Sequence, residues 1–374
     1  MLVTQCGGPP NRGDNPLNRP GCAPWSESLV PKCSLYDICN REVEVNPGEG
    51  LCILHSKEQT KDESAFADAL EKHRKERGDN FAYMMFPKKA DFSGAKFTEK
   101  ADFRGVGFSQ GAFFSEATFT QGADFRGAIF TLVDFLEATF DEGADFSRAR
   151  FCEKAFFINA RFVKEAIFDG TIFMEEVSFG GATFLGKTLL ASGQTRSGET
   201  IPIFSGIEVD FRGVILNPSD AIAFKEADLT TCRFLDTDLR KVQMTGVEWP
   251  HIGSRIGVYD EVAPFQSGES RPWLRIEQLY RGLKQNYEDR HDYERAGDFH
   301  YGEKEMRRQN PQTRCSLRCL LMLYWQVSGY GERMLRPLLW ALGLFAACTF
   351  FYLWCGLRPA KEDYVSGLTL RNVW

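Results

Sequence analysis

The stretch that decides the fold begins ADFSGAKFTEKADFRGVGFSQGAFF at residues 90–114 and continues in the same style to Phe184. Phenylalanine returns in it every five or six residues, and a small residue, usually alanine, stands two positions before most of these phenylalanines. A fixed internal period of this kind indicates a repeat architecture. The phenylalanines are Phe92, Phe97, Phe103, Phe108, Phe114, Phe119, Phe125, Phe130, Phe135, Phe140, Phe146, Phe151, Phe157, Phe162, Phe168, Phe173, Phe179 and Phe184.

The period excludes the ordinary elements. A helix needs apolar residues every three to four positions, and a half-buried strand needs strict alternation. A step of about five residues fits a coil with flat faces, in which each face takes one step and then turns a corner. Residues i and i−2 of an extended segment share a side, so each phenylalanine and the small residue before it point inward. Stacked coils then pair their backbones at the usual strand spacing of roughly 4.8 Å.

Units such as ADFSG (residues 90–94) and ADFRG (residues 123–127) resemble pentapeptide repeats, with the pattern A-(D/N)-(L/F)-x-x. The resemblance implies a mainly β fold, a right-handed quadrilateral β-helix with four units per coil. The six-residue steps depart from the strict pattern and imply an extra corner residue, as at Lys100 or Gly122. We expect the β-helix to occupy residues 81–250, with a Gly/Ser/Thr-rich insertion loop at 186–206, less regular units over 209–249 and an end at Pro250.

Composition bounds the remaining possibilities. The chain has 374 residues, a net charge of −6 and a pI near 5.6, so bulk affinity for nucleic acid is not expected. Residues 1–24 hold no apolar signal-peptide core, which predicts a reducing cytoplasm for the N-terminal part. In that compartment, clustered cysteines favour metal binding over disulfides.

Residues 1–30 are rich in Gly, Pro, Asn and Ser and are predicted to be disordered. Residues 31–58 follow with the spacing Cys33-x5-Cys39-x12-Cys52-x2-His55. Four such ligands suit a closed structural zinc site. The alternative is unpaired cysteines and a surface histidine, and Cys22 could replace Cys33 as a ligand. The arrangement resembles a zinc-binding knuckle that precedes the repeats in some family members, which implies structural zinc.

Residues 59–80 are expected to hold a short helix over Asp62–Arg77 that caps the open N-terminal end of the solenoid. Its apolar face would carry Phe66, Leu70 and His73. The Phe81–Pro87 run would begin the first coil.

Beyond the repeats we expect a linker at 251–271 and a helical hairpin at 272–310. Its helices would begin at Pro272 and cover Tyr293–Arg308. The hairpin resembles a single tetratricopeptide-type pair, but the interpretation we favour is a connector that docks on the C-terminal end of the solenoid.

Residues 335–357 predict a transmembrane helix, since no charge follows Pro337 for about twenty-one residues. A buried core helix is the alternative. Arg314, Arg318, Arg333 and Arg336 precede the uncharged stretch that begins at Pro337, so the positive-inside rule predicts a single-pass protein of the cell membrane in this chain. The N-terminal bulk would be cytoplasmic and the 358–374 tail extracytoplasmic. Residues 311–334 would lie in the membrane interface.

The Ser328-Gly329-Tyr330-Gly331 sequence is similar to a potassium selectivity filter, but its position before the first span favours a tight turn. Some pentapeptide-repeat proteins carry a C-terminal two-helix pore domain resembling a potassium channel. The present sequence resembles the start of that arrangement, without a pore helix, filter or second span. It therefore predicts either a truncated channel-like chain or a simple anchor.

These features predict a membrane-anchored cytoplasmic scaffold that binds an unknown protein partner, or the regulatory part of an ion-channel-like protein. Homo-oligomers remain open. The alternative is a DNA mimic that inhibits a topoisomerase, as some acidic family members do. Five arginines in the repeats dilute the acidic field that a mimic needs: Arg104, Arg126, Arg148, Arg150 and Arg161. No phosphate loop, catalytic triad order or open metal site is found, so an enzyme is not expected.

Overall fold

The computed structural model describes residues 52–56, 62–194, 200–218, 221–264 and 270–355. The chain divides into two compact units, residues 1–306 and 307–374, and each is described by itself. The predicted disordered segment 1–30, Cys33, Cys39 and the 358–374 tail lie outside the described residues.

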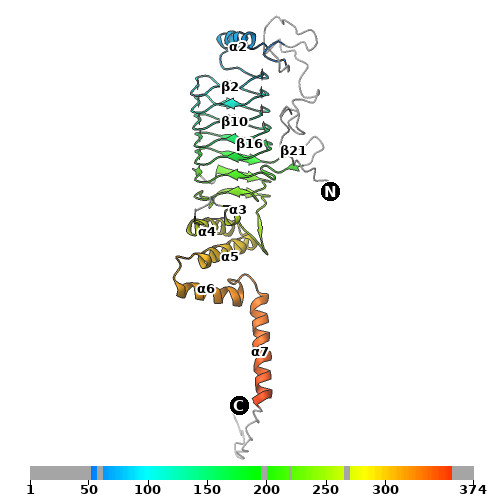
Figure 1. The fold of residues 1–374 in the computed structure, drawn as a ribbon, viewed down its shortest axis with the longest axis vertical. Coiled ribbons are helices and arrows are strands. Elements are labelled where there is room, and N and C mark those ends of the chain that lie inside the picture. The colour runs from blue at the N-terminus through cyan, green and yellow to red at the C-terminus, as the bar shows by residue number, and fades with distance from the viewer. Residues whose placement is uncertain (1–51, 57–61, 195–199, 219–220, 265–269, 356–374) are drawn as a thin grey trace, which may run out of the picture. The chain divides into compact units, whose positions relative to one another are not determined.

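The repeats form stacked coils whose short strands build four parallel sheets (Figure 1). Sheet A contains β4 (Ala101–Asp102), β8 (Ala123–Asp124), β12 (Ala144–Asp145), β16 (Ala166–Asp169), β20 (Thr188–Ala191), β25 (Ile222–Lys225) and β27 (Gln243–Thr245). Sheet B contains β1 (Met85–Phe86), β5 (Gly107–Phe108), β9 (Ile129–Phe130), β13 (Arg150–Phe151) and β17 (Ile172–Phe173).

The other two sheets complete the four sides. Sheet C contains β2 (Ala90–Asp91), β6 (Ala112–Phe113), β10 (Val133–Asp134), β14 (Ala155–Phe156), β18 (Val177–Ser178), β23 (Val209–Asp210) and β26 (Cys232–Arg233). Sheet D contains β3 (Lys96–Phe97), β7 (Thr118–Phe119), β11 (Thr139–Phe140), β15 (Arg161–Phe162), β19 (Thr183–Phe184) and β24 (Ile215–Leu216). The prediction of a mainly β solenoid with four units per coil is confirmed.

The pairing register gives the length of a coil. Ala90 lies beside Ala112, and Ala112 lies beside Val133, so successive coils advance by 22 and 21 residues. Four five-residue units account for twenty of these, and the rest are extra corner residues. One is Gly122, which has φ +87°; a Cβ there would lie 2.6 Å from the Gly143 carbonyl oxygen. This corner therefore requires glycine.

The core is a set of phenylalanine columns that run along the stack. Phe97, Phe119, Phe140, Phe162 and Phe184 stack with ring centroids 4.6 to 4.8 Å apart and planes within 5° of parallel. This spacing equals the separation of paired strands, so each ring covers the ring of the previous coil. The small residues two positions before the phenylalanines also point inward, and most are fully buried, including Ala101, Ala117 and Ala138.

The predicted insertion loop at 186–206 includes residues that belong to the solenoid, so its first bound is wrong. Thr188–Ala191 is strand β20, which pairs with β16 and β25, and Leu190 is buried in the core. Leu190 stands where the repeat has phenylalanine, so the five-residue phenylalanine pattern does not reveal this strand. The excursion begins after Ala191 and includes the antiparallel pair β21 (Gly193–Gln194) and β22 (Thr200–Ile201).

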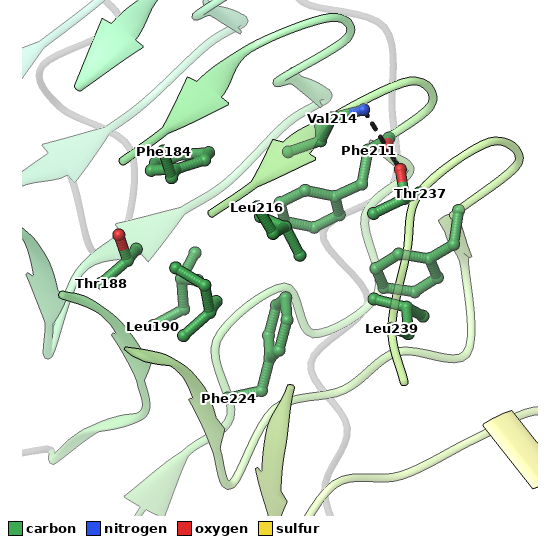
Figure 2. A pocket seen from close by; sticks show the side chains of 11 residues that line it. Phe184, Thr188, Leu190, Phe211, Val214, Leu216, Phe224, Thr237 and Leu239 are labelled. Atoms are coloured by element: carbon green, nitrogen blue, oxygen red, sulfur yellow. Dashed lines mark hydrogen bonds between the residues drawn. The ribbon is translucent and has the colours of Figure 1, made fainter. Parts of the chain in front are cut away.

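A small cavity of about 10 Å³ lies in these later coils. Figure 2 shows Phe184, Leu190, Leu216, Phe224 and Leu239 around it.

The N-terminal end of the stack carries α2 (Glu63–Arg77), in the segment expected to be helical (Figure 1). Asp62 caps the helix by accepting a hydrogen bond from the Ala65 amide at 3.0 Å. Phe66 packs edge-on against Phe86 with centroids 5.5 Å apart. The Met85 amide, in the first strand of sheet B, donates to the Leu54 carbonyl at 2.8 Å.

The expected linker at 251–271 is wrong for its described first part, residues 251–264. The chain forms the antiparallel pair β28 (His251–Ile252) and β29 (Arg255–Ile256), followed by α3 (Tyr259–Val262). Asp260 and Glu261 are buried in α3. Acidic residues suggest an exposed linker in sequence, but here they bind backbone and side-chain groups at the end of the solenoid.

Helices α4 (Trp273–Asp289) and α5 (Tyr293–Gln309) form the expected hairpin on the C-terminal end of the solenoid (Figure 1). The Trp249 indole donates to the Tyr287 hydroxyl at 2.8 Å, and the Asn286 amide donates to the Leu239 and Val242 carbonyls. Phe299 packs fully buried against Trp249. These contacts favour the docked connector over a tetratricopeptide-type pair.

The second unit contains α6 (Cys315–Ser328) and α7 (Leu335–Cys355). Between them Gly329, Tyr330 and Gly331 all have positive φ, and the Gly331 amide donates to the Ser328 carbonyl. This is the tight turn that the sequence favoured.

Candidate binding surfaces

The predicted zinc ligands Cys52 and His55 lie side by side at the start of the described chain. The Cys52 Sγ and His55 Nδ1 atoms are 2.9 Å apart, because a turn closed by hydrogen bonds to the Cys52 carbonyl brings the residues together. The His55 Nε2 atom donates to the Ala82 carbonyl at 3.3 Å, and His55 is buried. Within the described ranges no group of three or more potential metal ligands occurs.

This pair fits half of a zinc site. A zinc-bound histidine typically donates its second ring N–H to a backbone carbonyl, as His55 does to Ala82. The remaining two ligands of the prediction, Cys33 and Cys39, lie outside the described residues. The structure therefore brings Cys52 and His55 together, and the four-ligand zinc site stays a prediction.

Arginine and aspartate side chains alternate along the outer side of sheet A. Arg104 makes a bidentate contact with Asp102 and also approaches Asp124 of the next coil at 3.9 Å. Arg126 repeats this pattern with Asp124 and, at 3.6 Å, with Asp145. The coil spacing places each arginine between two carboxylates. We call this row, from Asp102 to Asp145, the charge ladder.

The ladder neutralises acidic groups that a DNA mimic would display. Burial alone would raise the pKa of Asp124, but hydrogen bonds from the Arg126 side chain and amide outweigh it and leave that pKa lowered. Asp124 is therefore ionised and paired. The same two-residue pairing recurs at Asp210–Arg212 and Asp238–Arg240. Paired charges of this kind project a weak net field.

Sheet C presents apolar side chains on its outer side. Phe113 and Phe156 lie between inward-facing neighbours and therefore point outward. Leu136 and Ile158 directly follow the inward Phe135 and Phe157 of adjacent coils, and all four side chains are half-buried. We call Phe113, Leu136, Phe156 and Ile158 the sheet C patch. The repeat pattern leaves these positions unspecified, so the sequence alone did not indicate this patch.

Comparison with known proteins agrees with this geometry. The family described as "Pentapeptide repeats (9 copies)" matches residues 81–129, 103–150 and 125–172. Residues 81–172 are pentapeptide repeats. No curated protein and no solved structure matches the chain.

A buried polar cluster closes the C-terminal end of the pentapeptide-repeat solenoid. Arg255 donates twice to Glu261 at 2.7 Å and once to the Tyr280 hydroxyl at 3.0 Å. Burial raises the pKa of Tyr280, so its hydroxyl remains protonated and can donate to Glu261. Each charged group has a partner, which buried charges require. The sequence did not indicate this cluster, because charged residues in a short segment predict solvent exposure and no local pattern links Arg255 and Glu261 to Tyr280.

Asp298 and His300 are two residues apart and of types that can perform acid–base chemistry, but their contacts are structural. The Asp298 carboxylate accepts a hydrogen bond from the Ile256 amide at 3.0 Å. Burial, together with Lys284 and Lys304, lowers the pKa of His300. Asp298 thus connects α5 to β29.

In the described part of the chain one helical stretch, Leu335–Trp354 of α7, is long and apolar enough to cross a membrane, with mean hydropathy 1.6. None of this stretch is buried.

Proposed function

We propose that this chain is a membrane-anchored binding scaffold, in which α7 spans the bilayer and the pentapeptide-repeat solenoid binds a protein partner. The observation that carries the proposal is α7 itself. Leu344, Phe345 and Leu353 are 67, 73 and 74% exposed, and such a surface is unfavourable in water. A hydrocarbon core of about 30 Å would cover it.

The orientation follows from the arginines at the N-terminal end of α7. Arg314, Arg318 and Arg333 precede α7 and Arg336 lies in its first turn, and cationic residues at this end of a span favour the cytoplasm. The solenoid is then cytoplasmic in the proposed arrangement, and the anchor belongs to the cell membrane.

Alkaline carbonate extraction of membranes tests the anchor. The wild-type chain should stay in the pellet, and Leu342→Arg/Phe345→Arg should release it, because each arginine at a helix centre costs about 2.5–3.5 kcal/mol. The matched control is Leu342→Ala/Phe345→Ala, which should remain in the pellet. Release of the wild-type chain would overturn membrane anchoring.

The sheet C patch is the proposed partner surface, since outward apolar groups flanked by polar residues mark binding sites. A photo-crosslinking residue at Ile158 should form protein adducts in membranes. The control is Thr139, which points outward from sheet D and is similarly half-buried. Equal labelling at both positions, or none at Ile158, would argue against this surface.

A channel-regulating role is the narrower form of this proposal, in which the partner is a pore. The topoisomerase alternative is disfavoured by the charge ladder. A supercoiling assay with micromolar protein tests it directly: inhibition of gyrase would favour the mimic, and unchanged supercoiling would remove it. We assign no catalytic role to the chain.

We also propose that Cys33, Cys39, Cys52 and His55 hold one structural zinc ion. The pairing of Cys52 with His55 and the Ala82 contact support it. Metal analysis of the purified full chain should give about one equivalent of zinc, and Cys52→Ser/His55→Ala should lose it. Less than about half an equivalent in the wild-type chain would refute the site.

A further inference from the structure

We propose that α6 and the arginines around it bind anionic lipid headgroups, with the apolar side of α6 in the membrane interface. The inference rests on the proposed membrane anchor and adds a lipid preference to it. It concerns only the second unit of the chain.

The charge of this region is opposite to that of the rest. Residues 307–336 contain six arginines, one glutamate, and neither lysine nor aspartate, which gives 6 − 1 = +5. The whole chain carries −6, so the other residues carry −6 − 5 = −11. Positive charge is thus concentrated beside the start of α7. The arginines are Arg307, Arg308, Arg314, Arg318, Arg333 and Arg336.

Contacts with the first turns of α7 fix the end of α6. Arg336 donates to the Trp325 carbonyl at 2.8 Å, and its guanidinium lies 5.1 Å from the centre of the Trp325 ring. The Arg308 guanidinium lies 5.4 Å from the same ring. The Trp340 indole donates to the Gln326 carbonyl at 3.2 Å. Both tryptophans therefore lie where α6 meets the span, and tryptophan favours the interfacial level of a bilayer.

The two sides of α6 differ in a way that suits a bilayer surface. Leu320, Leu323 and Val327 share one side of the helix and are 61, 60 and 44% exposed. Arg314 occupies the N-cap position, and Arg318 follows one turn later on the side opposite the leucines. Both arginines are exposed, and the described part of the chain shows neither of them in an ion pair with a carboxylate.

An anionic membrane has groups that bind both the arginine side and the apolar side of α6. Guanidinium groups bind phosphate oxygens in pairs, and acyl chains cover apolar side chains. A nucleic acid would bind the arginines but leave the leucines in water. The continuity of α6 with the proposed span also places these arginines at headgroup level.

Lipid selectivity of the full chain in nanodiscs tests the inference. Electron paramagnetic resonance of spin-labelled phosphatidylglycerol and phosphatidylcholine measures how strongly each lipid associates with the protein. We expect a preference for phosphatidylglycerol, and Arg314→Gln/Arg318→Gln should reduce it by about fivefold or more. The control Lys96→Gln/Arg161→Gln removes two exposed cations from sheet D and should leave the preference unchanged.

Equal association of both lipids with the wild-type chain would overturn the proposal, and so would equal losses in the two double variants. A variant that changes the oligomeric state but not lipid selectivity would reassign this side to self-association. A second experiment distinguishes failure of the lipid site from failure of the membrane span. If carbonate releases the chain but the chain still floats with phosphatidylglycerol vesicles and not with phosphatidylcholine vesicles, the lipid site stands and the span is refuted.

Discussion

The coils of residues 90–184 have strands in all four sheets, whereas those of residues 188–249 have strands in sheets A, C and D, and the two regions fill their centres differently. In the first region every inward face carries phenylalanine, and rings stack 4.6 to 4.8 Å apart along sheet D. In the second region leucine occupies inward positions at 190, 216 and 239, and a cavity of about 10 Å³ lies among them (Figure 2). In the first region each ring stacks on the ring of the next coil, whereas the mixed aliphatic and aromatic side chains of the second region leave a small space between them.

The core consists of columns of side chains that run along the axis of the stack. Each inward side chain is packed mainly by the equivalent side chains of the coils above and below, as in other solenoids. A gap in one column is therefore not closed by movement of a distant element. The consequences of substitution should depend on the column in which they fall.

The largest effect is expected from Phe125→Ala. The Phe125 ring is fully buried and stacks on Phe103 and Phe146, with centroids 4.9 Å away on both sides. Removing it should lower the free energy of unfolding by about 3–5 kcal/mol, because the stack cannot collapse along its axis. Denaturant unfolding of the full chain in detergent, followed by far-ultraviolet circular dichroism, measures the loss.

Leu190→Ala is the matched variant in the second region, and it should cost nearer 2 kcal/mol, since its surroundings are already loosely filled. Equal losses at the two positions would contradict the distinction between the regions.

A second difference concerns the backbone at the end of the stack. Within the stack, the amide of an inward phenylalanine donates to the next coil, as Phe125 does to the Asp145 carbonyl and Phe211 to the Arg233 carbonyl. Phe234 directly follows β26 (Cys232–Arg233), the last strand of sheet C, and its amide donates instead to the Asp260 carboxylate at 2.8 Å. The Leu235 amide donates to the same carboxylate. The Asp260 carboxylate thus accepts the amide hydrogen bonds that the carbonyls of a further coil would accept.

This replacement should make stability depend on pH. Burial raises the pKa of Asp260 to about 6, despite opposing hydrogen bonds from the Phe234 and Leu235 amides. A raised carboxyl pKa favours the protonated folded form. Its contribution is complete below about pH 4 and is lost as pH rises through about 6. The wild-type chain should lose on the order of 2–3 kcal/mol relative to Asp260→Asn over this window.

Unfolding free energies of both chains at several pH values between 4 and 7 give this difference. The asparagine variant keeps an acceptor oxygen but does not titrate, so other carboxylates cancel in the comparison. A difference that stays constant with pH, or that grows in the opposite direction, would show that the amide donors keep Asp260 ionised.

The sequence predicted the repetitive part well, because period, corner residues and inward phenylalanines all follow from a local pattern. The α2 cap and the docked hairpin were also apparent from helical periodicity. The end of the solenoid was not, since Asp260, Arg255 and Glu261 act through partners that only the fold identifies. Strand β20 was missed because Leu190 stands where the pattern has phenylalanine. For the zinc site, spacing suggested four ligands, and the structure joins Cys52 and His55.

A smaller, stabilising effect is expected from Leu216→Phe. Leu216 lies beside Phe184 in the parallel pair of β24 with β19 and faces the cavity (Figure 2). A ring there would extend the sheet D column by one step, and a stacked aromatic pair contributes about 0.5–1.5 kcal/mol. Leu216→Met, which conserves volume without a ring, should stay near the wild-type stability. Thermal unfolding would disprove the stacking argument if methionine stabilised as much as phenylalanine.

The smallest effects concern the paired charges outside the core. Arg126 contacts carboxylates of two coils, Asp124 and Asp145, whereas the ion pair recorded for Arg212 is with Asp210 of its own coil. Both arginine side chains are about half exposed, so solvent screens them strongly. Arg126→Ala should therefore cost about 0.5–1 kcal/mol, and Arg212→Ala about 0.2–0.5 kcal/mol.

Salt separates this charge effect from a change in packing. At about 1 M NaCl the screening length falls to roughly 3 Å, so the two variants should converge toward each other. Thermal unfolding in low and high salt provides the four values. If the loss at Arg126 persists in high salt, its side chain acts by covering apolar surface. If the two losses are already equal in low salt, the second carboxylate contributes nothing, and the charge ladder consists of independent pairs within each coil.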